Sequence, residues 1–468
     1  MSDQQSPPSS FGFDHDGPAV QSKQDCEQAV RTTFMWPLRT WVGPVVAGAL
    51  MRIGVWALGR SGDRFLSPDS HDYWRLAGDV SVYSTLDGPL LETALLRVPG
   101  YPLILALFRL IGNNYATAAL LQSLVGVLAV FMTYQVALRL LNSWVASVAA
   151  WWLAVEPLHV VESSILLTEV TFSVLLMGAI LVLTPLASRP LPLLPMWRWL
   201  VAGLFIAAAT FVRAISLYLP LLVLLCAVVI ARYVDRRRMT LGILMFLVAF
   251  GLPVGLWFAH IHAATGVATF STIQGANLAF YRAVGAMVHG DGLPVEEARQ
   301  EMRRLVEEKT TAGMNPADVA QVQTSVGTRE IVKRPVGYAV STIRGLLYTL
   351  FGPGRADIRE RLAIQPWQSL TLPITAISFA SAIASFAFSA FGIWLLIRRR
   401  RWVPLLLLVL PVGYLLMVGS GQESDSRFRV PIEPVLMILA GIAVNTLASL
   451  KKQRGIGLPA KEVKNSTP

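Results

Sequence analysis

Long runs of apolar residues, separated by short polar stretches, occupy most of the chain from residue 37 onward. A hydrocarbon core about 30 Å thick is crossed by roughly 20 apolar residues in a helix, and backbone groups in lipid must bond to one another. Runs of this length therefore predict an all-α, polytopic transmembrane helical bundle of about ten spans. The expected spans are residues 37–58, 115–138, 143–158, 168–187, 198–212, 214–231, 239–259, 371–397, 402–420 and 430–449.

Two long polar or amphipathic stretches, 59–114 and 260–370, interrupt these runs. In the first, acidic and apolar residues recur at helical spacing from Asp69 to Leu76, which predicts a short helix lying in the membrane interface. In the second, acidic and basic residues alternate at helical spacing over 294–309, which is typical of a solvated helix. We therefore expect interfacial helices in both loops.

The chain divides into three regions. Residues 1–34 are polar and rich in Gln, Ser and Asp, which predicts a disordered cytoplasmic tail. Residues 35–450 form the expected transmembrane domain with both long loops, and 451–468 form a second cytoplasmic tail. No short apolar run with a small-residue cleavage site opens the chain, so we expect the first span to be a retained anchor.

Composition and charge agree with a membrane protein. Hydrophobic residues make up 54% of the chain and charged residues 15%, whereas a soluble protein carries about a quarter charged residues. The net charge of +11 does not indicate nucleic-acid binding, because the densest basic clusters directly abut apolar runs, as orientation signals and anionic-lipid contacts do. With both termini in the cytoplasm, the basic clusters all fall on the cytoplasmic side: Arg31 and Arg39, Arg189 and Arg198, Arg232 with Arg236 to Arg238, Arg398 to Arg401, and Lys451, Lys452 and Arg454. We expect a multi-pass protein of the inner (plasma) membrane with both long loops extracytoplasmic.

Acidic residues gather on the opposite side of the expected membrane, at outer helix ends or in outer loops. They are Asp69, Asp72, Glu156, Glu162, Glu169, Glu423, Asp425 and Glu433. Carboxylates from loops far apart in the sequence can therefore share one outward-facing cavity. Four arginines of the first outer loop, Arg97 among them, break the charge trend and call for another explanation.

Metal and disulfide sites are not indicated. His159 with Glu162, and His260 with His262, do not complete a three-ligand set of recognised spacing. We expect no cofactor; a divalent metal is chemically compatible with the acidic side chains but has no motif. The two cysteines are Cys26, in the polar tail, and Cys226, in an apolar run, so a structural disulfide is not expected.

Short motifs on the outer side carry the candidate chemistry. In chain order they are Asp69-Ser70 with Tyr73 and Ala77, Arg97 with Pro99, Tyr101 and Pro102, Thr168-Glu169, Phe211-Val212-Arg213, and Arg427 to Pro431. Together they resemble the polytopic GT-C glycosyltransferases of family 39 type, which include the dolichyl-phosphate-mannose protein mannosyltransferases and the bacterial lipid A aminoarabinose transferase. The resemblance covers most of residues 37–449. It departs at Ala214, where many relatives have proline, and the loop 260–370 matches nothing diagnostic of a substrate.

The resemblance implies a membrane enzyme that moves a sugar from a polyprenyl-phosphate carrier to a lipid, glycan or protein acceptor on the extracytoplasmic face, with inversion at the anomeric carbon. The acceptor hydroxyl needs a base, for which Asp69 is the candidate; a positioned base contributes about 10²–10⁴ in rate. Glu169 is expected to arrange the acceptor or the base.

The leaving phosphate needs cations, which contribute about 10²–10³ in rate per donor. Arg97, Arg427 and Arg429 are the candidates for phosphate binding, and the family pattern adds Tyr73 and Arg213 as substrate-binding residues.

Structural interpretations compete with these roles. Asp69 could cap the helix that follows Pro68. Asp72 could be a solvated neighbour rather than a site residue. Glu169 could be there because a carboxylate is stabilised at the positive N-terminal end of a helix.

The arginines also have structural interpretations. Arg97 and Arg427 could anchor to lipid head groups, and Arg429 alternates with Arg427 and so should point elsewhere. Arg213 is expected near the outer surface or a cavity because burying it in lipid costs about 2.5–3.5 kcal/mol. Arg52 could be the partner of an acid.

Two other function classes remain open. A transporter or flippase of lipid-linked glycans commonly carries internal repeats and polar residues at the membrane midplane. This chain shows no repeat and keeps its acids on one side, which favours the enzyme. A ligase transferring a whole glycan would be expected to place its chemistry in a large late outer loop.

Overall fold

The computed structural model describes residues 41–60, 64–187, 194–231, 236–362 and 367–455. Within these ranges the secondary structure is helical, and no strand is present. The tail expected at 1–34, with Cys26, lies outside the described residues, as does most of the tail expected at 451–468. Arg31, Arg39, Arg189 and Arg232 of the orientation signals also lie outside them.

Seven helices among these ranges are long and apolar enough to cross a membrane. They are α2 (Val42–Gly59), α7 (Tyr115–Leu140), α10 (Glu169–Leu183) with the following turn η1 (Thr184–Ala187), α13 (Arg236–Thr265), α20 (Thr371–Arg398) with the preceding turn η4 (Trp367–Leu370), α21 (Trp402–Gly419) and α22 (Glu433–Gly455). The three other expected spans are shorter apolar helices: α8 (Ser143–Val155), α11 (Met196–Val212), and the pair η2 (Ala214–Tyr218) and α12 (Leu219–Ala231). The all-α multi-pass fold is confirmed, and the count of ten spans stays a prediction.

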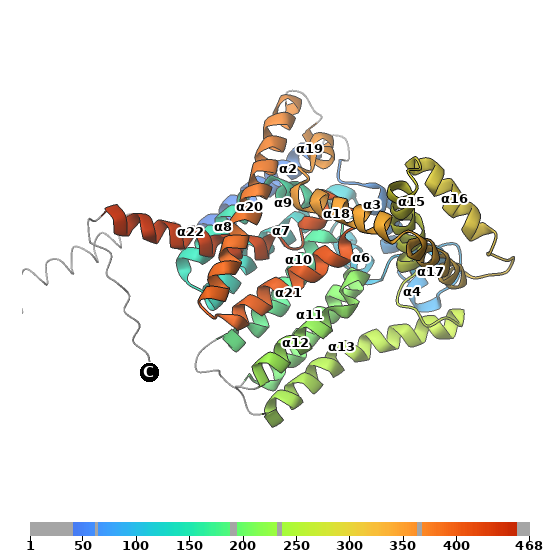
Figure 1. Cartoon of the computed structure of the whole chain (residues 1–468), viewed down its shortest axis with the longest axis horizontal. Coiled ribbons are helices and arrows are strands. Elements are labelled where there is room, and N and C mark those ends of the chain that lie inside the picture. Colours follow the sequence, from blue (N-terminus) through green and yellow to red (C-terminus); the bar gives the residue numbers. More distant parts are fainter. Residues whose placement is uncertain (1–40, 61–63, 188–193, 232–235, 363–366, 456–468) are drawn as a thin grey trace, which may run out of the picture.

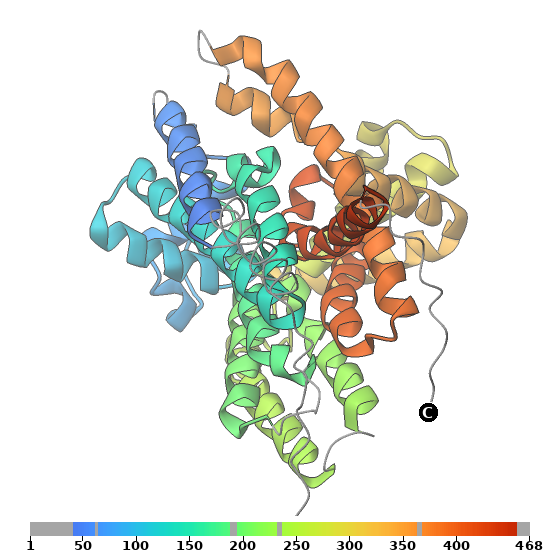
Figure 2. The ribbon, with the colours of Figure 1, turned by 90° about the vertical axis from the view of Figure 1, so that its left-hand side faces the viewer.

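The helix α10 lies against α7 and α11 and is mostly buried. The helices α2 and α8 pack on α7, and α20 and α8 pack on α22 (Figure 2). A side chain at Gly392 of α20 would collide with the carbonyl oxygen of Leu439 in α22. Small residues let membrane helices approach this closely, which adds packing contacts where lipid supplies no hydrophobic driving force.

The two long loops are named the first and the late outer loop for the side of the membrane that the sequence predicts. The first outer loop folds into four short helices: α3 (Pro68–Gly78), α4 (Val82–Thr85), α5 (Leu91–Leu96) and α6 (Gly100–Ile111). The helix expected from Asp69 to Leu76 is confirmed as part of α3. Its N-cap is Ser67, which exchanges bonds with Ser70: the Ser67 N–H donates to Ser70 Oγ at 2.9 Å. Proline at the first position also suits a helix start.

The late outer loop contains seven elements between residues 273 and 362. They are α14 (Ile273–Asn277), the π-helix η3 (Leu278–Ala283), α15 (Val284–Gly290), α16 (Val295–Glu307), α17 (Pro316–Lys333), α18 (Pro335–Phe351) and α19 (Arg355–Leu362). The helix expected over 294–309 is α16. Its Arg304 pairs with Glu301 and Glu308 on the exposed face, while Met302 and Val306 are buried.

Both outer loops gather at one end of the molecule. In Figure 1 the helices α15, α16 and α17 lie toward the same end of the molecule as α3 and α4, away from the C-terminal part of α22. The two loops are joined directly, because the N–H of Thr272 donates to the carbonyl of Leu95 at 2.9 Å. Two connecting elements complete this end: α9 (Pro157–Glu162) and the 3-10 turn η5 (Ser426–Arg429).

Arg52 is fully buried in α2 and ties that helix to α8 and α9. Its guanidinium donates to Nδ1 of His159 at 2.8 Å, to Oγ of Ser163 at 3.1 Å and to the carbonyl of Ala154 at 3.2 Å. Its direct hydrogen-bond partners among the described residues are therefore a histidine, a hydroxyl and carbonyls, and no acid is among them. Cys226 is a buried free thiol of α12.

Candidate active site

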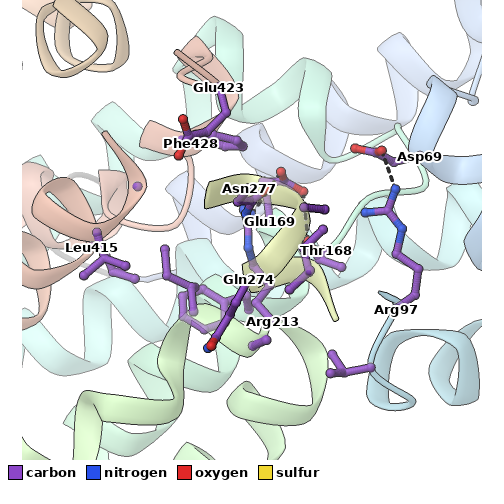
Figure 3. A pocket seen from close by; sticks show the side chains of 18 of the residues that line it. Asp69, Arg97, Thr168, Glu169, Arg213, Gln274, Asn277, Leu415, Glu423 and Phe428 are labelled. Atoms are coloured by element: carbon purple, nitrogen blue, oxygen red, sulfur yellow. Dashed lines mark hydrogen bonds and ion pairs between the residues drawn. The ribbon is translucent and has the colours of Figure 1, made fainter. Parts of the chain in front are cut away.

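A cavity of about 670 Å³ lies where the two outer loops meet the ends of the long helices. Its wall is built by α3, α10, α14 and α21, together with the turns after α11 and before α22 (Figure 3). Six of the sequence-predicted site residues line it: Asp69, Tyr73, Arg97, Glu169, Arg213 and Arg427. Residues from positions 69 to 427 thus share one cavity.

Asp69 stands in the first turn of α3, but Ser67 takes the capping role, so the interpretation of Asp69 as the cap was wrong. The carboxylate of Asp69 instead joins two arginines. Its Oδ1 lies 2.6 Å from Nη2 of Arg97, and its Oδ2 lies 3.0 Å from Nη2 of Arg427. These charge-assisted contacts hold α3, the turn after α5 and the turn η5 together.

The charges around Asp69 decide its ionisation. Burial alone would raise the pKa of Asp69, but the nearby charges of Arg97 and Arg427, and their hydrogen bonds, bring it below its ordinary value. Burial also works against the charge of Arg427, yet the carboxylates of Glu169 and Asp69 raise the pKa of Arg427. Asp69 is therefore a carboxylate and Arg427 a cation across the physiological pH range.

Glu169 opens α10 next to these groups and is almost fully buried. Its Oε1 lies 3.0 Å from Nη1 of Arg213 and 3.9 Å from Nε of Arg427. Its other oxygen is 3.2 Å from the hydroxyl of Thr168. Glu169 thus positions two cavity arginines, a more specific role than neutralising the end of its helix.

Arg213 ends α11 in an extended conformation, so its side chain leaves the helix and enters the cavity. The ring of Phe428 lies between two guanidinium groups, 5.4 Å from the central carbon of Arg213 and 5.6 Å from that of Arg427. A cation over an aromatic face is attracted to it, which helps two like charges approach. The expectation that Arg213 lines a cavity is confirmed.

Arg97 is held on its other side by Tyr73 and Asp72. The buried ring of Tyr73 lies 5.2 Å from the guanidinium carbon of Arg97, and Oδ2 of Asp72 lies 3.3 Å from its Nη2. Tyr73 lines the cavity and Asp72 does not. Asp72 therefore orients Arg97 from behind.

Arg429 does not line the cavity. It is 1% exposed, its Nε lies 3.0 Å from Oε1 of Glu433, and its Nη1 donates to the carbonyls of Thr349, Leu350 and Gly352. The alternation with Arg427 predicted this difference. The phosphate-binding role expected for Arg429 is not supported by this position, which instead anchors η5 to α18.

The charged side chains that line the cavity sum to one positive formal charge. Its charged lining consists of four arginines and three carboxylates: Arg97, Arg213, Arg282 and Arg427, with Asp69, Glu169 and Glu423. A site with one excess positive charge attracts an anion of low charge.

Several lining residues were not found from the sequence. Gln274, Asn277, Tyr281 and Arg282 come from α14 and the π-helix of the late outer loop. Arg282 pairs with Glu423, which lies on the loop after α21, at 3.1 Å between Nε and Oε1. The only signal in the sequence was a short polar and aromatic stretch just after the end of α13.

The histidine groupings do not come together as ligands. His159 accepts from Arg52, and Nε2 of His260 lies 3.1 Å from the carbonyl oxygen of Tyr83. In the part of the chain that the structure describes, no group of three or more His, Cys, Asp or Glu side chains is arranged to hold a metal ion.

Comparison with known proteins identifies the fold. No protein-family model matches the chain, and no curated protein does. The apo oligosaccharyltransferase of Archaeoglobus fulgidus matches with a TM-score of 0.51 and 15% identity, over 92% of this chain and 53% of that chain. The A. fulgidus oligosaccharyltransferase AglB with an inhibitory peptide and a dolichol-phosphate gives 0.48 and 13%, over 90% and 52%. Apo ArnT from Cupriavidus metallidurans gives 0.39 and 14%, over 90% and 81%.

The chain therefore spans about half the length of the archaeal oligosaccharyltransferases that it matches. The fold shared with the apo oligosaccharyltransferase confirms the expected GT-C architecture. At this identity the similarity is one of fold.

Proposed function

We propose that the protein is a membrane glycosyltransferase that moves a sugar from a polyprenyl-phosphate carrier to an acceptor at the extracytoplasmic face, with inversion. The observation that carries the proposal is the meeting of Asp69 and Glu169 with Arg97, Arg213 and Arg427 around one cavity of a GT-C fold. A solved oligosaccharyltransferase has the same fold.

The donor fits the two kinds of lining. A sugar phosphodiester carries one negative charge, which matches the one excess positive charge of the cavity. One side of the cavity is formed by η2 and α21, two elements among the apolar helices. It is lined by Ile215, Tyr218, Leu415 and Val418. These side chains would contact the first isoprenoid units, while Arg427 and Arg213 take the phosphate.

Transfer is a single displacement. The acceptor oxygen forms a bond to the anomeric carbon as the bond from that carbon to the phosphate oxygen breaks. The polyprenyl phosphate leaves with the electron pair, and Asp69 takes the proton of the acceptor hydroxyl. Attack opposite to the leaving group inverts the anomeric configuration.

Donor binding would also prepare the base. In the described state two guanidinium groups hold Asp69 as a weak base. A phosphate oxygen that takes Nη2 of Arg427 leaves Asp69 with Arg97 alone, so the pKa of Asp69 rises. A base whose pKa lies nearer to the working pH removes a proton more effectively.

The test is transfer by purified full-length protein in lipid nanodiscs. The co-purifying polyprenyl-phosphate sugar is identified, and transfer is measured for Asp69→Asn and for the matched control Asp87→Asn, an exposed position of the same loop. We expect Asp69→Asn to lose about 10²–10⁴ in rate while donor binding is retained. Wild-type transfer by Asp69→Asn would overturn the base assignment. Transbilayer movement of the donor without transfer would favour a flippase.

The membrane orientation has its own test. In a Cys226→Ser background that also lacks Cys26, we expect Ser84→Cys to react with an impermeant thiol reagent added to intact cells. A cysteine in place of the exposed Lys451 should react only after lysis. The reverse pattern would place the cavity on the cytoplasmic side.

A further inference from the structure

The cavity has a second end that the proposed transfer step does not use. Gln274, Asn277 and Tyr281 line it from the late outer loop, together with the ion pair Arg282–Glu423. Figure 3 shows Gln274 and Glu423 away from the pair Asp69–Arg97, with Asn277 nearer to Glu169, within the same cavity. The transfer step as proposed assigns no role to these residues.

This end is built rigidly. Ser271 Oγ donates to the carbonyls of Leu95 and Leu96 at 3.0 and 2.9 Å, which fixes the start of α14 against α5. A side chain at Gly327 of α17 would lie 2.7 Å from the carbonyl carbon of Leu278, so α17 touches the backbone of the π-helix. Single-turn π-helices are rare and frequently occur at functional sites.

The polar groups at this end are available for a ligand. The side-chain amides of the exposed Gln274 and the partly buried Asn277 make no hydrogen bond to another described residue, and Tyr281 is 38% exposed. Oε2 of Glu423 is buried without a hydrogen-bond partner among the residues that the structure covers. Unpaired amides and a carboxylate oxygen favour a ligand rich in hydroxyl groups.

The charge at this end is balanced. Arg282 is held by Glu423 and also donates to the carbonyl of Val418, so its cation has partners before any ligand arrives. A phosphate-bearing acceptor would need a free cation here, and a basic peptide would need a free carboxylate. The neutral lining, with Phe280 and Tyr281 as aromatic surfaces, fits an uncharged polyhydroxyl compound.

The proposed acceptor-binding residues also come from other elements than those assigned to the donor's isoprenoid chain. The donor's isoprenoid chain approaches through lipid beside η2 and α21, whereas α14 and the π-helix belong to the outer loop. Resting on the proposed sugar transfer, we propose that this end is the acceptor subsite and that the acceptor is a neutral sugar or glycan. Gln274 and Asn277 bind its hydroxyl groups and set its specificity.

The experiment compares acceptors and variants in nanodiscs. The donors are mannose, glucose and arabinose, each linked to undecaprenyl phosphate. The acceptors are neutral mono- to trisaccharides of mannose, glucose, galactose and arabinose, a phosphorylated glycolipid, and a lysine-rich peptide. We expect transfer to a neutral saccharide. Gln274→Ala and Asn277→Ala should each raise its KM roughly two- to tenfold, the value of one hydrogen bond. Slow release of undecaprenyl phosphate to water, measured without acceptor, reports the donor reaction independently of the acceptor.

The control is Gln321→Ala, an exposed glutamine of α17 that does not line the cavity. Transfer only to the glycolipid or the peptide, or an unchanged acceptor KM in both variants, would overturn the acceptor subsite while leaving sugar transfer intact. Wild-type protein that neither transfers nor hydrolyses any of the donors would overturn both proposals. Thermal unfolding of each variant distinguishes a lost contact from misfolding.

Discussion

The carboxylate of Asp69 and the guanidinium of Arg427 lie 3.0 Å apart, although 358 positions separate them in the chain. The other oxygen of Asp69 is 2.6 Å from Arg97. One carboxylate therefore connects the first outer loop to the turn that precedes the last helix. The ion pair also sets the ionisation of the proposed base, so each partner has a measurable effect on the other.

The pH profile should show this coupling. Because the arginines lower the pKa of Asp69, the acid limb of kcat/KM, which reports the free enzyme, should lie below about pH 4. The limb of kcat, which reports the donor complex, should lie at higher pH. In Arg427→Gln, Asp69 stays buried but loses one neighbouring cation, so its pKa rises. As the medium is acidified, the activity of this variant should therefore begin to fall at a higher pH than that of wild type.

The matched control is Arg359→Gln, an exposed arginine of α19 outside the cavity, which should keep the wild-type profile. An acid limb of kcat/KM that is the same in Arg427→Gln and in wild type would contradict the coupling. Arg427→Gln should also reduce kcat by about 10²–10³, because one donor to the leaving anion is gone.

Arg429 should matter for stability and not for donor binding. Arg429→Ala leaves Glu433 buried without its partner, which costs about 3–5 kcal/mol. The double variant Arg429→Met, Glu433→Leu removes both charges and should recover much of the lost thermal stability. Unfolding of the detergent-solubilised protein measures this. An Arg429→Ala protein of normal stability with a raised donor KM would restore the phosphate-binding role.

Gly100 sets the distance between Arg97 and Arg213. A Cβ added at Gly100 would lie 2.6 Å from the carbonyl carbon and oxygen of Phe211 and 2.9 Å from the nitrogen of Val212. These are backbone atoms, which cannot move aside as the end of a flexible side chain can. Gly100→Ala should therefore lower stability by about 1–3 kcal/mol and reduce transfer. The control Gly255→Ala, where no atom lies within 4 Å, should lower neither.

Asp357 should make stability depend on pH. Burial, followed by the charge of Asp425, raises the pKa of Asp357 to about 6, against the attraction of Arg427 and Arg361. The folded state then binds more protons than the unfolded state between about pH 4 and 6, so stability falls as the pH rises through that window.

The measurement is the difference in Tm between Asp357→Asn and wild type. The Tm of the variant should rise relative to that of wild type between about pH 4 and pH 7. The corresponding change in the free energy of unfolding is roughly 2–3 kcal/mol. The exposed Asp87→Asn should show no such trend. A constant difference across the range would mean that Asp357 titrates normally.

The apolar runs predicted the fold well because membrane-spanning helices are specified locally, by length and hydropathy. The spacing from Asp69 to Leu76 likewise predicted α3, and the order of the motifs selected the residues that meet in the cavity. The contact between Asp69 and Arg427 has no local signal, because it depends on how α3 and η5 are placed by all the helices between them.

Other features could not be predicted from the sequence for specific reasons. The amides of Gln274 and Asn277 lie on a short helix followed by a π-helix, whose irregular period leaves no repeating pattern. Arg427 and Arg429 are two residues apart and look equivalent in sequence. Only the turn η5 shows that one enters the cavity and the other lies among the carbonyls of α18.

The late position of Arg427 has a consequence for biosynthesis. A nascent chain that has inserted every helix up to α21 already holds Asp69, Glu169 and Arg213, but the ribosome has yet to deliver the guanidinium that joins Asp69 to Glu169. If the protein transfers sugar as proposed, such an intermediate meets the carrier lipid in the same membrane without the means to release its sugar. Sugar would therefore not be lost to water before translation is complete.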